Sequence, residues 1–402
     1  MLFVIPIDIC SRLSRSNLTG FHKVPIMMKI TLALLGSHTL LVLFGFALFF
    51  GLAHADEFKA IKREESSSGL FAPPPALKVL APSHFPPPTL KLGEDVQILL
   101  EPVFGVHRPD QDAVFAYAEG YKLAYYMNFM ETLTSTGFRG DVVLAIAEDS
   151  IVRENVKDYL ETFAQGDTNK PSVVVYQIPL DCDGTDDHQR ATSKQGELDI
   201  FQMCRMGAGV YGWKDEFGHV IRSATDPRGG RTAATIRYEW YWICSRQYDK
   251  HSWIMLLDAR DSFFQSDPFV GLPREKDAYR PDGLLYMFGE NSNATRLGIS
   301  KKNRNWLTRG YGNKVINILK DYPTICSGST MGEQVAIETY LRAMVNEHDE
   351  CEVRMTGSDQ GFHNVSLMCM AAAFPLLPLC SPCLCSIFIT VKNWLKQPRS
   401  GA

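Results

Sequence analysis

The sequence lacks the features that mark several common classes of protein. It has no excess of positive charge, because 41 lysine and arginine residues stand against 45 aspartate and glutamate residues, for a formal net charge of −4. This balance gives no reason to expect a nucleic-acid partner, which would require a basic surface. The chain also shows no internal repeat. Its GxGxxG match, residues 207–212, lies in a polar stretch and does not lead into a predicted helix, so a dinucleotide-binding Rossmann domain is disfavoured.

Cysteine is present but too sparse for a disulfide scaffold, with 10 residues in a chain of 402. Cys380, Cys383 and Cys385 cluster near the end of the chain, but no matching second pair accompanies them, which argues against a zinc site. In the body of the chain, the pairs Cys182–Cys204 and Cys326–Cys351 are candidate disulfides. The sequence alone leaves the connectivity open.

A long apolar run near the N-terminus indicates the cellular compartment. Residues 30–53 contain no charged side chain apart from a protonatable histidine, and they are long enough to span a hydrocarbon core of about 30 Å as a helix. Basic residues precede the run and acidic residues follow it. The positive-inside rule therefore places residues 1–29 in the cytosol and the rest of the chain in the lumen. The alternative is a secretory signal cleaved at Ala53-His54-Ala55, and both alternatives lead into the secretory pathway.

Two further features agree with a lumenal domain behind an anchor. Residues 54–109 contain the triplets Pro73-Pro74-Pro75 and Pro86-Pro87-Pro88, which favour extended polyproline segments and predict a stem. Acceptor triplets for N-glycosylation begin at Asn293 and Asn364. We expect the folded domain to occupy residues 110–365.

The pattern of apolar residues in this domain predicts an α/β fold. Strands are expected at 114–117, 141–147, 172–178, 253–257 and 283–288, and helices at 121–135, 152–164, 232–248 and 333–345. Strands that alternate with helices of this length are typical of a mostly parallel sheet with flanking helices. The polar stretch 181–230 is expected to be a solvated excursion, and residues 303–312 a polar-aromatic loop.

The most informative motif follows the apolar strand 253–257. There the chain places Asp258 and Asp261 directly after the strand, where ligands bind in open α/β sheets. Two carboxylates at one strand end suit Mg²⁺ or Mn²⁺ bound together with substrate phosphates. The simpler interpretation is a capped turn in which Asp261 pairs with Arg260 or with a backbone amide.

Two later segments supply further polar residues. The loop expected at 326–332 is small and hydroxylated, and it includes Ser327, Gly328 and Ser329. Before a helix, such a loop presents free backbone N–H groups that bind anions, although an ordinary turn has the same composition. Residues 357–364 then contain Asp359, Gln360 and His363.

The order of these motifs resembles one family. The Arg237-Tyr238-Glu239-Trp240-Tyr241 helix, Leu256-Leu257-Asp258-Ala259-Arg260-Asp261, Ser262 to Phe269, Asn305-Trp306, Cys326 to Gly332 and Asp359 to Asn364 follow one another in the chain. This succession is similar to a family of Golgi glycosyltransferases of the GT-A type, found in plants, algae and related eukaryotes. The resemblance covers roughly residues 113–364. It implies a GT-A-like nucleotide-diphospho-sugar transferase fold behind the membrane helix and the stem.

The resemblance also implies roles for individual residues. Asp258, Asp261 and His363 would hold Mn²⁺ or Mg²⁺, and Asp359 would contact the acceptor hydroxyl or act as the base. Arg237 and Arg260 would neutralise the diphosphate of a UDP- or GDP-linked sugar, and the donor site would include Ser327, Gly328, Ser329 and Gln360. The acceptor would be a glycan or glycoprotein hydroxyl, and the enzyme would be a single-pass type II protein of the Golgi or ER membrane with a lumenal catalytic domain. Because two residues separate the carboxylates, one of them could contact ribose instead of the metal.

Two alternatives to a transferase remain open at the level of sequence. The tail 366–402 is apolar, rich in cysteine and proline, and unlike the globular ending that the resemblance implies. A non-catalytic lumenal protein that binds glycans or acts as a scaffold would fit such an ending. A metal-dependent hydrolase using Asp258 and Asp261 is less consistent, because carboxylates on one strand end lie too close together to flank a glycosidic bond.

Overall fold

The computed structural model describes residues 82–118, 121–146, 155–164, 169–182, 203–272, 274, 282–290, 295–351 and 357–371. All of them belong to one compact unit. The predicted anchor 30–53, the stem residues 54–81, the first two residues of the Asn293 triplet and residues 372–402 lie outside the described residues. Within the described ranges, no helix is long and apolar enough to cross a membrane.

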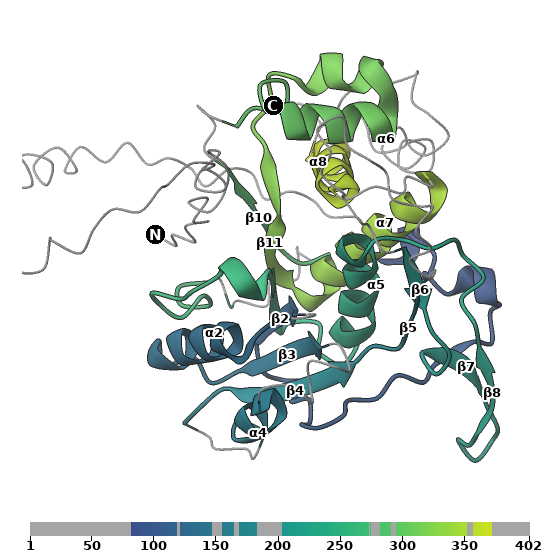
Figure 1. Cartoon of the computed structure of the whole chain (residues 1–402), viewed down its shortest axis with the longest axis vertical. Coiled ribbons are helices and arrows are strands. Elements are labelled where there is room, and N and C mark those ends of the chain that lie inside the picture. Colours follow the sequence, from purple (N-terminus) through teal and green to yellow (C-terminus); the bar gives the residue numbers. More distant parts are fainter. Residues whose placement is uncertain are drawn as a thin grey trace, which may run out of the picture. The chain divides into compact units, whose positions relative to one another are not determined.

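The centre of the unit is a mixed, mostly parallel six-stranded sheet of order β10-β11-β9-β2-β3-β4 (Figure 1). Four strands run parallel: β2 (Ala113–Tyr117), β3 (Asp141–Ile146), β4 (Ser172–Gln177) and β9 (Trp253–Leu257). Strand β11 (Ile325–Glu333) runs antiparallel to β9, and the edge strand β10 (Leu285–Gly289) runs antiparallel to β11. The predicted α/β class and its five strands are confirmed, because continuous apolar runs form strands that are buried on both faces.

Helices cover both faces of this sheet. The helices are α2 (Leu123–Ser135), α4 (Val156–Glu161), α5 (Ala233–Ser245), α6 (Lys301–Leu319), α7 (Gln334–Cys351) and α8 (Ser358–Ala371). Alternate strand residues point to opposite faces. Val114 and Val142 therefore pack with Phe129 of α2, whereas Phe115 and Val143 pack in a second cluster that contains Trp240 of α5.

Smaller elements surround the sheet. A three-stranded antiparallel sheet consists of β1 (Gln97–Ile98), β7 (Tyr211–Lys214) and β8 (Val220–Ala224), and a two-stranded one of β5 (Leu180–Cys182) and β6 (Cys204–Met206). Short 3-10 helices are η1 (Pro82–His84), η2 (Leu90–Leu92) and η5 (Ala259–Asp261). The described parts of the stretch 181–230 are thus partly folded into strands, although the sequence predicted only a solvated excursion.

The structure decides between the candidate disulfides. Cys182 and Cys204 are bonded and join β5 to β6, as predicted. Cys326 is a free thiol, so the expected bridge from Cys326 to Cys351 is wrong. Cys326 lies in β11, within the sheet.

Residues on both sides of the predicted domain range 110–365 pack with the folded unit or continue its elements. Before residue 110, Phe85 is buried in the core, and the carbonyl oxygens of Phe85 and Pro86 accept hydrogen bonds from Arg342 (3.3 Å) and Asn346 (3.1 Å). Proline has no backbone N–H, but its carbonyl still accepts hydrogen bonds, so the second proline triplet docks on the folded unit. At the other end, α8 continues past residue 365 to Ala371.

Two predicted loops are regular elements in the structure. Residues 303–312 belong to α6, where Leu307, Tyr311 and Val315 recur at helical spacing and are buried. Residues 326–332 belong to β11 and pair with β9. The small residues serve close packing here, because a Cβ at Gly332 would lie 2.6 Å from the carbonyl oxygen of Leu284. The predicted loop before a helix is therefore wrong, whereas the donor-binding role expected of Ser327, Gly328 and Ser329 stays a prediction.

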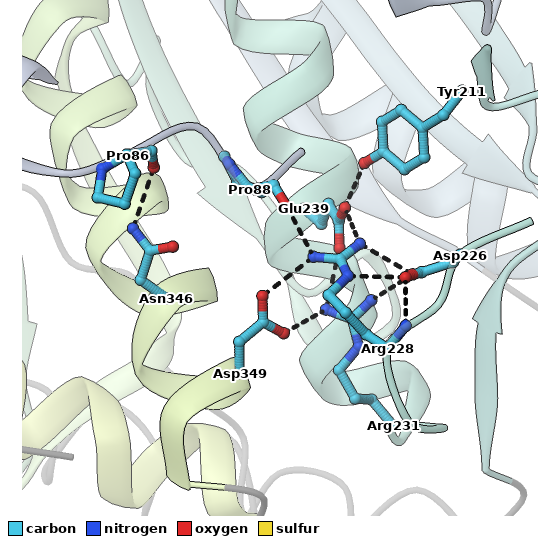
Figure 2. A network of polar contacts seen from close by, with 9 residues as sticks. All are labelled: Pro86, Pro88, Tyr211, Asp226, Arg228, Arg231, Glu239, Asn346 and Asp349. Atoms are coloured by element: carbon cyan, nitrogen blue, oxygen red, sulfur yellow. Dashed lines mark hydrogen bonds and ion pairs between the residues drawn. The ribbon is translucent and has the colours of Figure 1, made fainter. Parts of the chain in front are cut away.

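A buried network of charged side chains connects the loop that precedes α5 with α5 itself and with α7 (Figure 2). Arg228 binds Asp226 (2.7 Å), Asp349 (3.1 Å) and Glu239. Arg231 binds Asp226 (3.0 Å) and Glu239 (2.9 Å), and the Tyr211 hydroxyl donates to Glu239. Arg228 also donates to the carbonyl of Pro88 (3.2 Å). Charges this deeply buried require partners on every side.

We expect Glu239→Gln to lower the free energy of unfolding by about 3–5 kcal/mol, because it leaves two buried guanidinium groups undercompensated. Burial alone would raise the pKa of Glu239, but Arg228 and Arg231 outweigh it and hold this pKa at about 2. The ionised Glu239 carboxylate therefore stabilises the folded state fully above about pH 4.5, its pKa in the unfolded chain. This contribution is lost as the pH falls toward 2, its pKa in the folded state. Urea unfolding of both proteins across this pH range measures it. Glu161→Gln, which breaks the exposed pair with Lys157, is the control and should change stability by less than about 0.5 kcal/mol.

Candidate functional site

The candidate site lies where β9 ends. Asp258 follows directly after the strand, its backbone N–H donates to the carbonyl of Gly328 in β11 (3.2 Å), and its own carbonyl accepts from the Ser262 hydroxyl (2.7 Å). These bonds fix the backbone, while the Asp258 side chain remains 43% exposed. The carboxylate therefore lies at the carboxyl end of a parallel strand, where the sequence placed it.

Gly328 allows this carboxylate to lie close against the neighbouring strand. A Cβ at position 328 would be 2.7 Å from Oδ2 of Asp258 and 3.6 Å from Sγ of Cys326. Any side chain at this position would collide with the carboxylate. Gly328 thus belongs to the site because its missing side chain leaves room for the Asp258 carboxylate. It does not contribute through an anion-binding loop.

Arg237 of α5 links the strand end to α8. Its Nη1 binds Oδ1 of Asp258, and its Nη2 binds Oδ2 of Asp359 (2.9 Å). The Arg237 side chain is 10% exposed. Burial would lower its pKa, but the charges of Asp258 and Asp359 raise it well above the ordinary value. One permanently charged guanidinium therefore joins two of the predicted site residues.

Along the first residues of β11, side-chain amides of α8 form the backbone hydrogen bonds that a neighbouring strand would otherwise form. The Gln360 amide oxygen accepts from the backbone N–H of Ser327 (2.8 Å), and the Asn364 amide oxygen accepts from that of Ile325 (2.8 Å). Asn364 also donates to the Ile325 carbonyl (3.0 Å). Gln360 therefore braces β11. Asn364 is fully buried, so it is not accessible for the glycosylation that its triplet predicted.

Asp359 lies at the start of α8 and is nearly enclosed. Its Oδ2 accepts from Arg237 and from the Ser327 hydroxyl (3.2 Å), and its side chain is 7% exposed. Burial raises the pKa of Asp359, while the Arg237 charge opposes that rise. In this arrangement Asp359 orients Arg237 and Ser327. A base must reach the hydroxyl that it deprotonates, so the predicted catalytic role requires one of these partners to give way.

Asp261 and Arg260 form a pair at the surface of η5. The guanidinium Nε and Nη2 donate to the two carboxylate oxygens at 3.0 Å each, and both side chains are 54% exposed. This is the simpler interpretation that the sequence left open. Arg260 also lies 6.0 Å from the ring centroid of Tyr121. Burial raises the pKa of Tyr121, and the nearby charge of Asp258 raises it further.

His363 lies in the core. It is fully buried, and its Nδ1 is 2.6 Å from the Tyr340 hydroxyl, while Nε2 has no hydrogen-bond partner. Burial, and then the charge of Arg237, lower its pKa to about 3. The ring is therefore neutral at physiological pH and packs inside the domain instead of opening toward Asp258.

The predicted three-ligand metal site is not assembled in this arrangement. Among the residues that the structure describes, no group of three His, Cys, Asp or Glu side chains could hold a metal ion. Asp261 is paired with Arg260, and His363 with Tyr340. Asp258 alone fits, through its Oδ2 at the exposed strand end. One carboxylate together with substrate phosphates is an established mode of Mg²⁺ binding.

The structure also brings residues to the site that motif reading did not find. Tyr121, in the segment before α2, lies beside Asp258 and Arg260. The Tyr238 hydroxyl donates to the Ser327 carbonyl (3.4 Å), and the free thiol of Cys326 lies next to Gly328. These residues belong to different elements, so no local spacing in the sequence could have indicated them. Ser329 is buried in β11.

No protein-family model matches the chain, and no curated protein matches it. The resemblance derived from the order of the motifs therefore stays a prediction.

We expect Gly328→Ala to displace the Asp258 carboxylate with little loss of stability. The atom that the new methyl group meets is the end of a half-exposed side chain, which can rotate away. The metal-dependent nucleotide binding that the sequence predicts should weaken by about tenfold or more, equivalent to about 1.4 kcal/mol. Gly289→Ala in β10 is the control, because its Cβ would meet nothing nearer than 4.0 Å. Equal affinity in both variants, measured by calorimetry, would contradict a role for this position.

We expect Arg237→Met to destabilise the fold by about 3–5 kcal/mol, because Asp359 then remains buried without its cation. Adding Asp359→Asn to this variant should recover a large part of the loss, since the buried charge is removed. Chemical unfolding of the two single variants and the double variant gives the coupling energy. Arg260→Met breaks an exposed pair and should cost less than about 0.5 kcal/mol. Additive effects of Arg237→Met and Asp359→Asn would show that the two residues are not coupled.

Proposed function

We propose that the chain is a metal-dependent glycosyltransferase with a GT-A-like fold, which moves a sugar from a UDP- or GDP-linked donor to a glycan or glycoprotein hydroxyl. The observation that carries the proposal is the exposed Asp258 carboxylate at the carboxyl end of β9, joined through Arg237 to Asp359. Four elements (α5, β9, β11 and α8) meet around these three side chains.

The architecture supports a ligand at this position. In open α/β sheets, ligands bind beyond the carboxyl ends of the parallel strands, and here that edge carries one open carboxylate and two arginines. Arg260 is 54% exposed and pairs only with a carboxylate that is exposed to the same degree. It can therefore turn to a diphosphate at small cost, because exposed pairs contribute about 1 kcal/mol or less.

A divalent ion in this site would be held by Asp258 together with the donor diphosphate. It would supply charge stabilisation for the departing nucleoside diphosphate. The residues of the chain have separate tasks: Arg237 holds one oxygen of Asp258 in place, and Gly328 leaves room for the other. In the base role, Asp359 would exchange the Ser327 hydroxyl for that of the acceptor, since both offer the same O–H donor to Oδ2.

The location of the protein is proposed on two grounds. The apolar run 30–53 predicts a type II membrane anchor in the Golgi or ER. The bond between Cys182 and Cys204 favours an oxidising compartment such as the lumen of the secretory pathway, because disulfides are rare in the cytosol.

A second candidate is a non-catalytic glycan-binding or scaffold protein that keeps this fold. It is favoured by the burial of Asp359 and His363 and by the pairing of Asp261 with Arg260. In such a protein the charged groups would serve stability and the site would bind without turnover.

We expect the full-length chain to bind either UDP or GDP in the presence of Mn²⁺, and Asp258→Asn to abolish this binding. Asp261→Asn should have a smaller effect, because Asp261 is already paired with Arg260. Calorimetric titration with and without Mn²⁺ measures both, with Asp95→Asn, an exposed residue outside the site, as the control.

The same preparations distinguish the two candidates when the corresponding nucleotide sugars are added. Metal-dependent binding together with donor hydrolysis or transfer supports the transferase. Binding without turnover supports the non-catalytic protein. The absence of metal-dependent binding by a folded wild-type chain would rule out the proposed donor site.

A further inference from the structure

A hollow lies at the bent helix α6, and Asp258 is not among the residues that line it. The cavity has a volume of about 770 Å³, and residues of both arms of α6 line it, together with Gly298 before the helix and Lys320 after it. The first arm contributes residues 301–308 and the second residues 313–317. We call this hollow the α6 groove.

The groove exists because α6 folds back on itself. A straight helix of 19 residues would separate its ends by about 28 Å. Here Gly312 adopts φ 78° and ψ 174° in the middle of the helix, a conformation that glycine reaches without strain. The end of α6 therefore returns to its start, where the N–H of Gly298 donates to the carbonyl of Lys320 (2.8 Å).

The walls of the groove are strongly basic. Residues 301–320 contain no acidic residue and six basic ones, namely Lys301, Lys302, Arg304, Arg309, Lys314 and Lys320. Four of these line the groove: Lys301, Lys302, Arg304 and Lys320. None of the four forms an ion pair with another residue in the part of the chain that the structure describes. In a chain with a net charge of −4, this concentration of unneutralised positive charge favours an anionic ligand.

The remaining walls suit a saccharide. Asn305, Asn313 and Asn317 offer amide donors and acceptors, and Thr308 adds a hydroxyl. Trp306 is half-buried and also lines the groove. Its ring is held against Gly357, where a Cβ would lie 2.1 Å from Cε2 of Trp306. A fixed aromatic surface with a few convergent polar groups is typical of ligand sites.

The groove is connected to the candidate site through α8. Gly357 immediately precedes this helix, and a Cβ at Gly361 in its first turn would lie 3.5 Å from the backbone of Trp306. The same turn carries Asp359 and Gln360, which contact Ser327. One helical turn therefore separates the groove from the polar contacts beside Asp258.

We propose that the α6 groove binds an acidic oligosaccharide, with the four cations engaging its carboxylate or sulfate groups and Trp306 and the amides contacting its sugar rings. Resting on the proposed function, this assigns an anionic glycan as the acceptor class, held by a subsite remote from the reacting hydroxyl. The uncharged amides and the hydroxyl beside the cations favour a saccharide over a nucleic acid, whose backbone carries one charge per nucleotide.

The test measures binding of defined oligosaccharides to the full-length chain in the absence of nucleotide and metal. The probes are a uronic-acid tetrasaccharide, a sulfated tetrasaccharide, a neutral tetrasaccharide and a short single-stranded DNA of equal charge. The groove variant combines Lys301→Gln, Arg304→Gln and Lys320→Gln. The charge-matched control combines Lys91→Gln, Arg139→Gln and Lys250→Gln, which are exposed and lie outside the groove.

At least one acidic tetrasaccharide should bind the wild-type chain and weaken as salt is added. The groove variant should lose about tenfold in affinity, because each of three exposed charge pairs contributes about twofold, while the control keeps the wild-type value. The carboxylate and sulfate probes show which anionic group is preferred. Equal binding of the neutral probe, equal loss in both variants, tighter binding of DNA, or no binding by the wild type each overturn the proposal.

The groove and the donor site can fail separately. Asp258→Asn should retain acidic-saccharide binding, because its side chain is not part of the groove. If nucleotide binding is absent but saccharide binding depends on the groove cations, the glycan site stands and the transferase function does not. If nucleotide binding depends on Asp258 and the saccharide does not bind, the transferase stands and the acceptor assignment is wrong.

Discussion

The structure depends on one constraint: every charge buried on helix α5 must meet a partner from another element. α5 is otherwise aromatic and apolar, and it lies in the core against the central sheet. Glu239 is compensated by Arg228 and Arg231 from the preceding loop, and Arg237 by Asp258 and Asp359. Because an unpaired buried charge costs several kcal/mol, these pairings fix α5 against the loop before it, the end of β9 and the start of α8. The stability of the domain and the geometry of its candidate site thus share one helix.

This arrangement explains why the site is half closed. Asp258 shares Arg237 with a deeper carboxylate, so one of its oxygens is committed to the fold and only the other faces the strand end. Asp359 is held even more tightly, by Arg237 and Ser327 together. These contacts fix the positions of the carboxylates, but they leave few oxygen atoms free to bind a metal ion. Any bound ion must therefore take its remaining ligands from the substrate or from water.

The sequence predicted the central sheet well and the polar segments after it less well. Continuous apolar runs such as Trp253–Leu257 can form only buried strands or buried helices, and their length favoured strands. By contrast, Ile325–Glu333 is built from small and hydroxylated residues that resemble a loop. It becomes a strand because β9, β10 and the side-chain amides of Gln360 and Asn364 satisfy its backbone. Local propensity carries no information about such partners. The helix α6 was missed because its polar residues and Gly312 concealed its buried stripe.

The sequence by itself determined that a carboxylate would follow a buried strand, because hydrophobic periodicity is a local property of the chain. It also determined that an α/β sheet would place this carboxylate at a ligand-binding edge. It also contained the correct alternative for Asp261, since adjacent residues of opposite charge readily pair. Only the tertiary structure decided that Arg237 bridges Asp258 and Asp359, that His363 lies in the core, and that Gly328 makes room for a carboxylate. These outcomes depend on which distant elements meet at the strand end, and burial and charge compensation act only after that packing is formed.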